Sequence, residues 1–230
     1  MKTRFDFTPL DWIFPPRCIV CKEIVGMRQA CKHVCDACAN MFTPINAAGA
    51  GGTAVYAYDS VRELIHEFKY RDKPRHAYGF AELMARRLTV LNFNFSDFCA
   101  LAPVPMHKKR ERERGYNQAA VLARALSRLA GAPSFPRLLS RIKDTPQQSS
   151  LNHGARVENL KGAIAVNRET ARAVETLCEK TGKGILLIDD VRTTGATLSA
   201  CVTAINEAIN NPRVIIKYLA ISEASLREPL

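Results

Sequence analysis

The sequence contains no apolar run long enough to cross a bilayer, one tryptophan and only 7% aromatic residues. A membrane-spanning helix needs about 20 consecutive apolar residues, so we expect no membrane span. The opening stretch MKTRFDFTPLDWIFPP has acids where a signal peptide needs an uninterrupted apolar segment. We therefore expect a cytoplasmic location, where thiols stay reduced.

Acidic residues are also few. The chain has 22 Asp and Glu against 33 Lys and Arg, and its formal net charge is +11 at pH 7. Such an excess favours a polyanionic partner or a phosphorylated ligand, although it also serves solubility alone. The hydrophobic fraction of 47% over 230 residues is that of a globular chain, and a chain of this length can bury a core.

Cysteines, in contrast, are concentrated. Five of the eight fall in CIVCKEIVGMRQACKHVCDAC, residues 18–38. This stretch contains two Cys-x-x-Cys knuckles, and a two-residue gap lets both thiolates of a knuckle reach one ion. Two knuckles complete a tetrahedral shell, so we predict a structural Zn²⁺ site with four ligands, Cys18, Cys21, Cys35 and Cys38.

The other cysteines have weaker assignments. Cys31 is spare in this scheme, and His33 is an alternate ligand. A redox or disulfide cluster is the competing interpretation of the whole segment. Cys99, Cys178 and Cys201 lie in apolar or helical contexts and are expected to be inert core thiols.

The pattern changes after the cysteine segment. PINAAGAGG reads as a linker, so we expect a zinc-binding module at residues 1–45 and a second domain at residues 46–230. Near-continuous apolar strands separated by helices indicate a parallel sheet covered on both faces, an α/β fold. Strands are expected at 53–58, 98–105, 162–166, 184–189 and 214–221.

Amphipathic periodicity predicts helices between these strands. The segment VRELIHEFKY is expected to start with a capping box of Ser60 and Glu63. A second helix begins near Pro74, and NQAAVLARALSRLAG predicts a third that Gly131 ends. Another helix is expected at about 195–209.

The stretch ILLIDDVRTTGAT, residues 185–197, runs from a buried strand into two adjacent aspartates and a turn of small residues. Ligands of open α/β sheets bind beyond the carboxyl ends of the strands, where Asp189 and Asp190 are expected. Backbone N–H groups at the start of the next helix form an anion site. Carboxylates that accept hydrogen bonds from hydroxyls therefore lie beside N–H groups that donate to a phosphate, which suits a ribose 5-phosphate. A capped turn whose acids have no ligand is the alternative.

LLIDDVRTTGAT resembles the phosphoribosyl-diphosphate (PRPP) signature of type I phosphoribosyltransferases. The resemblance implies a Rossmann-like type I phosphoribosyltransferase sheet, with Asp189 and Asp190 as the catalytic pair that holds the ribose 2- and 3-hydroxyls. Arg192 stands where this signature more often has an apolar or aromatic residue. The residues implied to wrap the 5-phosphate are Arg192, Thr193, Thr194, Gly195, Ala196 and Thr197.

The resemblance extends to one subgroup, the ComF family of competence-associated proteins, which includes GntX-like members. Residues 102–120, APVPMHKKRERERGYNQAA, resemble its diphosphate loop, and a four-cysteine module followed by a helix ending near Lys69 also fits. Membership implies a role in the uptake of single-stranded DNA, with that DNA and competence proteins as candidate partners. A further match in QSSLNHGARVENLKGAI rests on Gln148, Leu151, Arg156, Asn159 and Gly162.

The stretch HKKRERERGYNQ carries five positive and two negative side chains after a strand end. We expect a mobile loop that closes over the same site and neutralises a diphosphate; a solvated surface loop is the alternative. Tyr116 is the main aromatic nearby, and this scarcity weakens a stacking platform for single strands. The resemblance assigns further PRPP contacts to Lys69, Pro105, Met106, Arg110 and Arg114.

Three hypotheses follow. The first is a phosphoribosyltransferase, in which Mg²⁺ on the diphosphate and ribose hydroxyls assists a displacement with oxocarbenium character. The second is a competence factor that binds PRPP or single-stranded DNA without turnover. The third is a zinc-ribbon DNA-binding module with the larger domain as scaffold, and the intact aspartate and threonine motif argues against it.

Overall fold

The computed structural model of the chain describes residues 8–26, 29–45, 48–49, 51–71, 73–144, 162–209 and 211–224. Four positions of the expected family pattern, Gln148, Leu151, Arg156 and Asn159, lie outside these residues. Within them, no helix is both long enough and apolar enough to cross a membrane.

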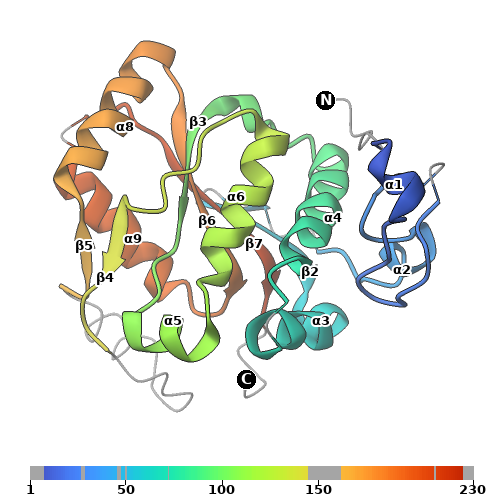
Figure 1. Cartoon of the computed structure of the whole chain (residues 1–230). Coiled ribbons are helices and arrows are strands. Elements are labelled where there is room, and N and C mark those ends of the chain that lie inside the picture. The colour runs from blue at the N-terminus through green and yellow to red at the C-terminus, as the bar shows by residue number, and fades with distance from the viewer. Residues whose placement is uncertain are drawn as a thin grey trace.

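The larger domain is built on a sheet whose strand order is β1-β2-β7-β6-β3 in the described part of the chain (Figure 1). Four of these strands are parallel, and β1 pairs with β2 in the antiparallel direction. This sheet confirms the predicted α/β fold. The strands are β1 (Ala48–Gly49), β2 (Gly52–Ala57), β7 (Ile216–Glu223), β6 (Gly184–Arg192) and β3 (Phe98–Pro103).

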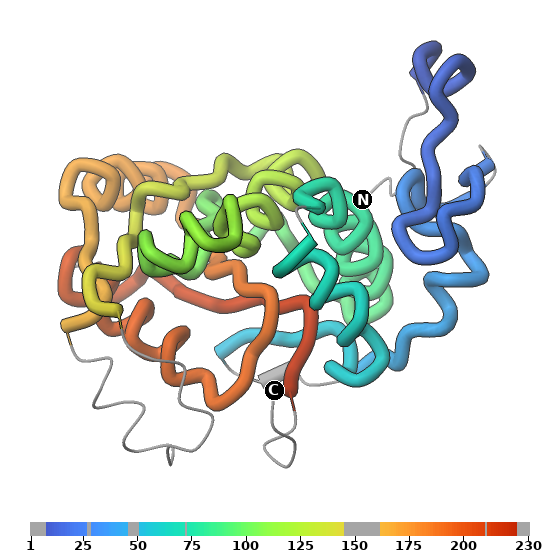
Figure 2. The backbone as a smooth tube through the Cα atoms, turned by 60° about the horizontal axis from the view of Figure 1, so that its bottom comes forward, coloured from blue at the N-terminus to red at the C-terminus, as the bar shows by residue number. Residues whose placement is uncertain are grey.

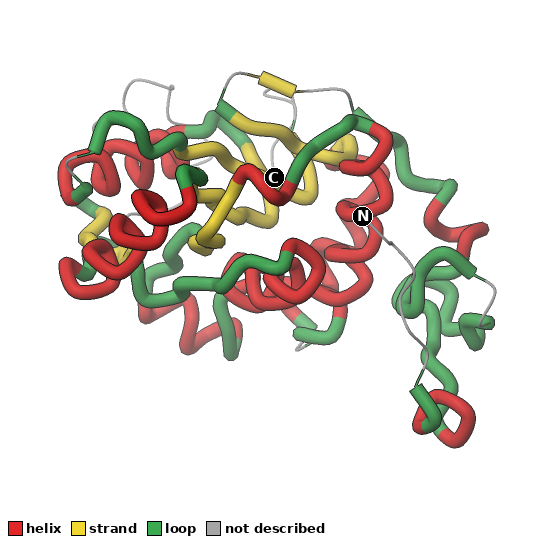
Figure 3. Tube along the Cα trace, turned by 90° about the horizontal axis from the view of Figure 1, so that it is seen from above, coloured by secondary structure: helices red, strands yellow, loops and turns green. Residues whose placement is uncertain are grey.

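Helices cover both faces of this sheet. Leu186 and Ile188 of β6 belong to a core shared with α3, α4 and α6, whereas Ile185 and Leu187 belong to a core shared with α8 and α9. Successive side chains of a strand point to opposite faces, so a strand buried on both sides must be apolar throughout. Figure 3 shows the helices gathered around the central strands. The helices are α3 (Tyr58–Tyr70), α4 (His76–Val90), α6 (Gln118–Ala130), α8 (Arg168–Thr181) and α9 (Ala196–Ala208).

Several local predictions hold. The amide oxygen of Asn117 accepts hydrogen bonds from the first N–H groups of α6, and Gly131 ends that helix with a left-handed φ of 66°. The capping box of Ser60 and Glu63 is wrong, because β2 runs directly into α3 at Tyr58. Ser60 therefore lies inside the first turn, where its hydroxyl donates to the Ala57 carbonyl at 2.8 Å.

The strand expected at 162–166 forms at β5 (Ile164–Val166) but lies outside the main sheet. It pairs with β4 (Leu139–Arg141) in an antiparallel ribbon. The expected basic loop is also different, because it forms the helix α5 (Lys108–Arg114) after the 3₁₀ turn η1 (Phe95–Asp97) and β3. His107 caps α5 and Gly115 ends it at φ 81°, so the stretch has both signals that delimit a helix.

The N-terminal module, with α1 (Leu10–Ile13) and α2 (Asp36–Ala39), packs on α4 at one end of the molecule (Figure 2). Ile19 presses on Gly79, where an added Cβ would lie 2.4 Å from the Ile19 Cδ1 atom. Buried residues of the module belong to the same core as those of α3 and α4. The boundary predicted at residue 45 stays a prediction.

A buried carboxylate fastens this contact. Glu82 of α4 is 3% exposed, and its two oxygens lie 2.7 Å from the His33 backbone nitrogen and 2.7 Å from the His33 Nδ1 atom. Arg86, one turn further along α4, reaches the Asp36 carboxylate at 2.9 Å. The module is therefore held to α4 by charge as well as by apolar packing.

Candidate functional site

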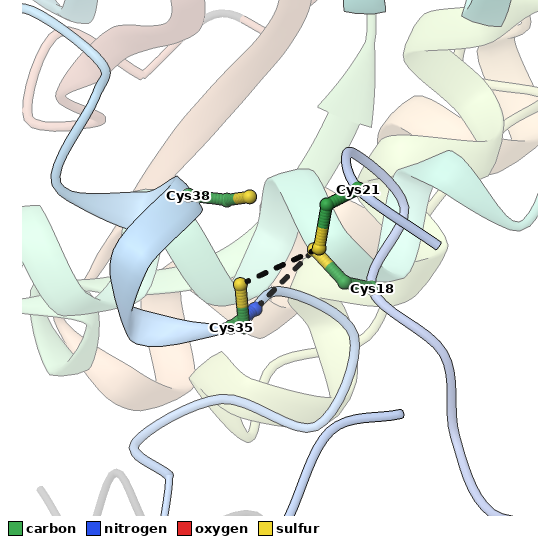
Figure 4. Close-up of side chains that lie close together, drawn as sticks. All are labelled: Cys18, Cys21, Cys35 and Cys38. Atoms are coloured by element: carbon green, nitrogen blue, oxygen red, sulfur yellow. Dashed lines mark hydrogen bonds between the residues drawn. The ribbon is translucent and has the colours of Figure 1, made fainter. Parts of the chain in front are cut away.

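The four predicted zinc ligands, two from each knuckle, lie together (Figure 4). Their Sγ atoms all fall within 4.8 Å of one another, and the Cys21 and Cys35 Sγ atoms are 3.7 Å apart. Four sulfurs at about 2.3 Å from one tetrahedral Zn²⁺ stand about 3.8 Å apart. The quartet of Cys18, Cys21, Cys35 and Cys38 therefore fits a single zinc ion.

The surroundings of Cys18 favour the thiolate that zinc requires. Burial acts to raise the pKa of Cys18, but N–H groups of Cys35, Cys21 and Val20 directed at its sulfur lower it to about 7. The Cys35 N–H donates to the Cys18 sulfur at 3.4 Å, the dashed nitrogen contact in Figure 4.

The two alternate ligands stay apart from this quartet. Cys31 is 1% exposed and is not part of the sulfur cluster, and burial raises the pKa of its thiol to about 12. The His33 ring nitrogen is engaged by Glu82. Cys31 and His33 therefore belong to the packing of the module against α4.

The two aspartates lie near the carboxyl end of β6, which extends to Arg192, beyond its expected end at residue 189. The Lys69 ammonium, at the end of α3, lies 3.2 Å from the Asp190 carboxylate. The Asp189 carboxylate accepts the Asp190 N–H at 2.9 Å, and the Asp190 carboxylate accepts the Val191 N–H at 2.8 Å. The structure thus brings together three of the predicted site residues from two distant segments.

Charge is distributed unevenly over this group. Burial, reinforced by the charge of Asp190, raises the pKa of Asp189 well above its usual value. Burial also opposes ionisation of Asp190, but the Lys69 ammonium outweighs it, and the pKa of Asp190 is lowered. For Lys69, burial acts to lower the pKa, but the Asp190 charge exceeds this effect and raises it. Asp190 and Lys69 form an ion pair, whereas Asp189 favours its protonated form.

Beside the aspartates, a tight turn leads from β6 into α9. Gly195 adopts a left-handed φ of 76° immediately before the helix, a conformation that glycine adopts without strain. The Thr194 hydroxyl accepts the Ala196 N–H at 3.4 Å, and the side chains of Thr193 and Thr197 are half-buried. The turn therefore opens a 13-residue helix with its first N–H groups at the site, which favours an anion.

The first residue of this stretch has a different arrangement from the threonines. The Arg192 guanidinium forms an ion pair with Glu223 on the neighbouring strand β7. It also lies over the Tyr218 ring, 5.4 Å from the ring centroid. Arg192 thus contacts two protein groups, whereas the resemblance assigns it to the phosphate.

The segment after β3 reaches the same edge of the sheet. The Val104 N–H donates to the Ile188 carbonyl at 2.8 Å, so the buried Pro105 and the half-buried Met106 follow directly beside the end of β6. Arg114 of α5 donates to the Tyr70 hydroxyl at 3.2 Å and to the Gln118 side-chain oxygen at 3.4 Å. Its charge also acts on Lys69, so Arg114 belongs to the rim of the site.

The residues between α5 and α6 hold this rim in place. The Tyr116 hydroxyl and the Gln118 amide both donate to the Phe68 carbonyl, and the Asn117 amide donates to the Val104 carbonyl at 3.1 Å. Phe68 precedes Lys69 on α3. The segment Gly115–Gln118, part of the stretch that resembles the diphosphate loop, therefore also fixes the position of Lys69.

Two residues near the site were missed by sequence reasoning. Burial lowers the pKa of Arg141 on β4, and the charges acting on it include those of Arg110 and Asp189. Tyr70, 59% exposed, has the Arg114 guanidinium 5.0 Å from its ring centroid. Neither has a motif of its own, and only the fold brings β4 to this edge.

Comparisons with known proteins bear on both parts of the chain. Residues 9–49 match the family described as "Double zinc ribbon domain". Together with the four-sulfur cluster, this match confirms the predicted structural zinc module.

Larger parts of the chain resemble three curated proteins. Competence protein F of Haemophilus influenzae is 37% identical over 102 residues, which cover 44% of this chain and 41% of that protein. Competence protein ComFC of Bacillus subtilis is 30% identical over 183 residues, covering 76% and 67%. DNA utilization protein YhgH of Salmonella typhimurium is 28% identical over 142 residues, covering 59% and 56%. The chain thus spans less than half of the first relative and about two thirds of the second.

Proposed function

The chain belongs to the ComF family, and from this premise we propose that it binds PRPP with Mg²⁺ at the carboxyl end of β6 and serves DNA uptake in natural competence. The names of the relatives, two competence proteins and a DNA utilization protein, support the second half. A cytoplasmic location fits this role, because the cysteine ligands of the zinc ion stay reduced there.

The ribose half of the ligand is matched by the aspartates. Burial and the charge of Asp190 raise the pKa of Asp189 more than the Asp190 N–H and the Lys69 charge lower it, so further donors would favour its carboxylate. One of the ribose 2- and 3-hydroxyls would donate to Asp189. The other would donate to Asp190, which keeps its ion pair with Lys69. Mg²⁺, when bound, would supply positive charge on the diphosphate and the ribose hydroxyls.

The two phosphate ends are matched by different groups. The turn of Thr193, Thr194 and Gly195 offers backbone N–H groups and hydroxyls to the 5-phosphate at the start of α9. Lys69 lies beside Asp190, the charge of Arg114 acts on Lys69, and both cations would favour the diphosphate. The observation that carries the proposal is that a buried cation and a carboxylate pair meet at the end of β6, directly before an amide-lined turn.

Transfer of the phosphoribosyl group to an acceptor is the catalytic part of the proposal. Departure of diphosphate develops positive charge at the anomeric carbon. Asp189 and Asp190 would stabilise that charge, while Lys69 and Arg114 would stabilise the departing oxyanion. Diphosphate release measured over a panel of nucleobases tests this part, and binding of PRPP without release from any of them favours a sensor.

Calorimetry tests binding itself. Titration of the protein with PRPP and Mg²⁺ should give saturable binding, and a variant with both Asp189→Asn and Asp190→Asn should lose it. Asp59→Asn is the matched control, because Asp59 is an exposed acid of α3. Equal affinity in the double variant and the control would remove the site assignment.

One observation favours single-stranded DNA as a second ligand. The ring of Tyr70 lies 4.8 Å from that of His66 and 5.0 Å from the Arg114 guanidinium. Bases stack on exposed aromatic rings and on arginine, and exposed lysines bind the backbone. Lys108 and Lys109 of α5 are exposed. Tyr70 is an exposed aromatic group that the sequence alone did not locate.

The DNA contact has its own test. Replacing Tyr70 with Ala should weaken binding of an oligothymidylate about tenfold, in line with the stacking energy of one base. Replacing Lys108 and Lys109 with Gln should instead reduce the salt dependence of the affinity. Lys180→Gln, an exposed change on α8, serves as the control. An unchanged affinity in the Tyr70 variant would exclude this surface.

A further inference from the structure

Arg192 is the last residue of β6, and the Thr193–Gly195 turn begins directly after it. Its register partner on β7 is Glu223, and the two side chains form an ion pair. The Ala224 N–H donates to the Arg192 carbonyl at 2.9 Å. Main chain and side chain of Arg192 are thus both tied to the end of β7, and the two charged side chains are only 30% and 28% exposed.

The guanidinium also lies over one aromatic ring and near the turn. Its carbon lies 5.4 Å from the centroid of the Tyr218 ring, and a Cβ added to Gly195 would lie 3.7 Å from the Arg192 Nε atom. The Tyr218 ring in turn rests on Gly52, where an added Cβ would lie 2.6 Å from a ring carbon. Tyr218 therefore links Gly52 of β2 to Arg192, which lies near Gly195 of the turn.

We propose that Arg192 is a positioning residue, which holds the Thr193–Gly195 turn in shape through Glu223 and Tyr218 instead of contacting the phosphate. The inference rests on the proposed function, because the turn is the part of that site which takes the 5-phosphate. An arginine at this place replaces the apolar packing that the signature more often has. The guanidinium provides a flat surface toward Tyr218 and a charged Nη1 donor for Glu223.

A direct contact of Arg192 with the phosphate would make the opposite prediction for Glu223. If Arg192 contacted the phosphate, Glu223 would compete with that contact, and Glu223→Gln would leave the affinity unchanged or tighten it. As a support, Arg192 needs Glu223, so Glu223→Gln and Arg192→Met should both weaken the binding of ribose 5-phosphate. We expect about fivefold for each, and no further loss in the double variant, because residues that act as one unit are not additive.

The experiment is calorimetry of the full chain with ribose 5-phosphate, with the two single variants, the double variant and Glu207→Gln as the control. Glu207 is an exposed glutamate on α9. Inorganic diphosphate with Mg²⁺ is titrated in parallel, because a local support for the turn leaves its affinity unchanged, whereas general damage to the fold weakens both ligands. Thermal unfolding of each variant checks that it is folded.

The outcomes separate the two claims. Saturable binding of ribose 5-phosphate to the wild type, weakened in both single variants without additivity, supports the positioning role. Wild-type binding that Glu223→Gln leaves intact overturns the positioning role and keeps the proposed function. No binding of PRPP or ribose 5-phosphate to the wild type overturns the proposed function, and the positioning role with it.

Discussion

The ammonium of Lys69 lies 3.2 Å from the carboxylate of Asp190, joining the end of α3 to the end of β6. Both side chains are largely buried, at 17% and 15% exposed. The pair is held from behind, because Tyr116 and Gln118 donate to the carbonyl of the residue before Lys69. Lys69 is therefore fixed in place by the fold and does not depend on a ligand for its position.

Loss of Lys69 should destabilise the protein as well as its site. Lys69→Met leaves the Asp190 carboxylate buried without its counter-ion, which we expect to cost about 2–3 kcal/mol of unfolding free energy. Adding Asp190→Asn should recover more than half of that loss, because the unpaired charge is then gone. Urea unfolding of the two variants measures both values, and a double variant no more stable than Lys69→Met would show that the charge pair is not the cause.

Loss of the Asp189 carboxyl should stabilise the protein, whereas loss of Lys69 destabilises it. The pKa of Asp189 in the folded protein is raised, so its contribution to stability is fully present below the unfolded pKa, about 3.9, and is lost as the pH rises through the folded value. Asp189→Asn removes this loss, so the variant should unfold at a higher temperature than the wild type at pH 8, by on the order of 2–4 °C. The difference should shrink as the pH falls.

Asp190→Asn provides the matched comparison for this pH series. The pKa of Asp190 is lowered, so its contribution is present above the unfolded value and is lost as the pH falls through the folded one. Asp190→Asn should therefore unfold at a lower temperature than the wild type at pH 8, and the two should converge in acid. Parallel curves for the Asp189 and Asp190 variants would contradict the assigned roles.

The residues themselves predicted the part of this site that lies within one segment, and the family resemblance added Lys69 and Arg114 from other segments. Asp189, Asp190 and the following turn could be found because strand, carboxylates and small residues are contiguous. The α5 helix was missed because a run of basic and acidic residues has no apolar periodicity, which left its caps as the only signals. Arg141 was missed because only the tertiary fold brings β4 to the edge of the sheet, and Tyr70 was missed because no motif marks it.

The zinc module leads to a prediction of metal content. The four sulfurs lie within 4.8 Å of one another, so metal analysis should give one zinc per chain. Cys38→Ser should lower this value and expose the contact with α4, because metal binding and folding of such modules are coupled. Thiol titration of the native protein gives the second measurement, and a quartet that reacts as freely as in denatured protein would exclude the bound ion.

Glu82 should be needed for the module to stay on α4. Glu82→Ala leaves two His33 donors without their acceptor in a buried contact, which we expect to cost about 3 kcal/mol. Glu82→Gln keeps one acceptor and should cost less. Release of zinc to a chromogenic chelator should be faster in Glu82→Ala than in the wild type, and equal rates would show that the module keeps its metal without this contact.

Gly79 allows the closest approach between the module and α4, and its substitution separates helix propensity from packing. In an isolated helix, Gly→Ala stabilises by about 1 kcal/mol. Here the new Cβ would lie 2.4 Å from the Ile19 Cδ1 atom and 3.2 Å from a methyl of Val34, and overpacking of a buried contact costs about 1–3 kcal/mol. We therefore expect Gly79→Ala to lower the unfolding free energy. Ile19→Val removes Cδ1, so Gly79→Ala should be less harmful in that background, or even stabilising. An equal increase in unfolding free energy from Gly79→Ala in both backgrounds would mean that the module does not press on α4 in solution.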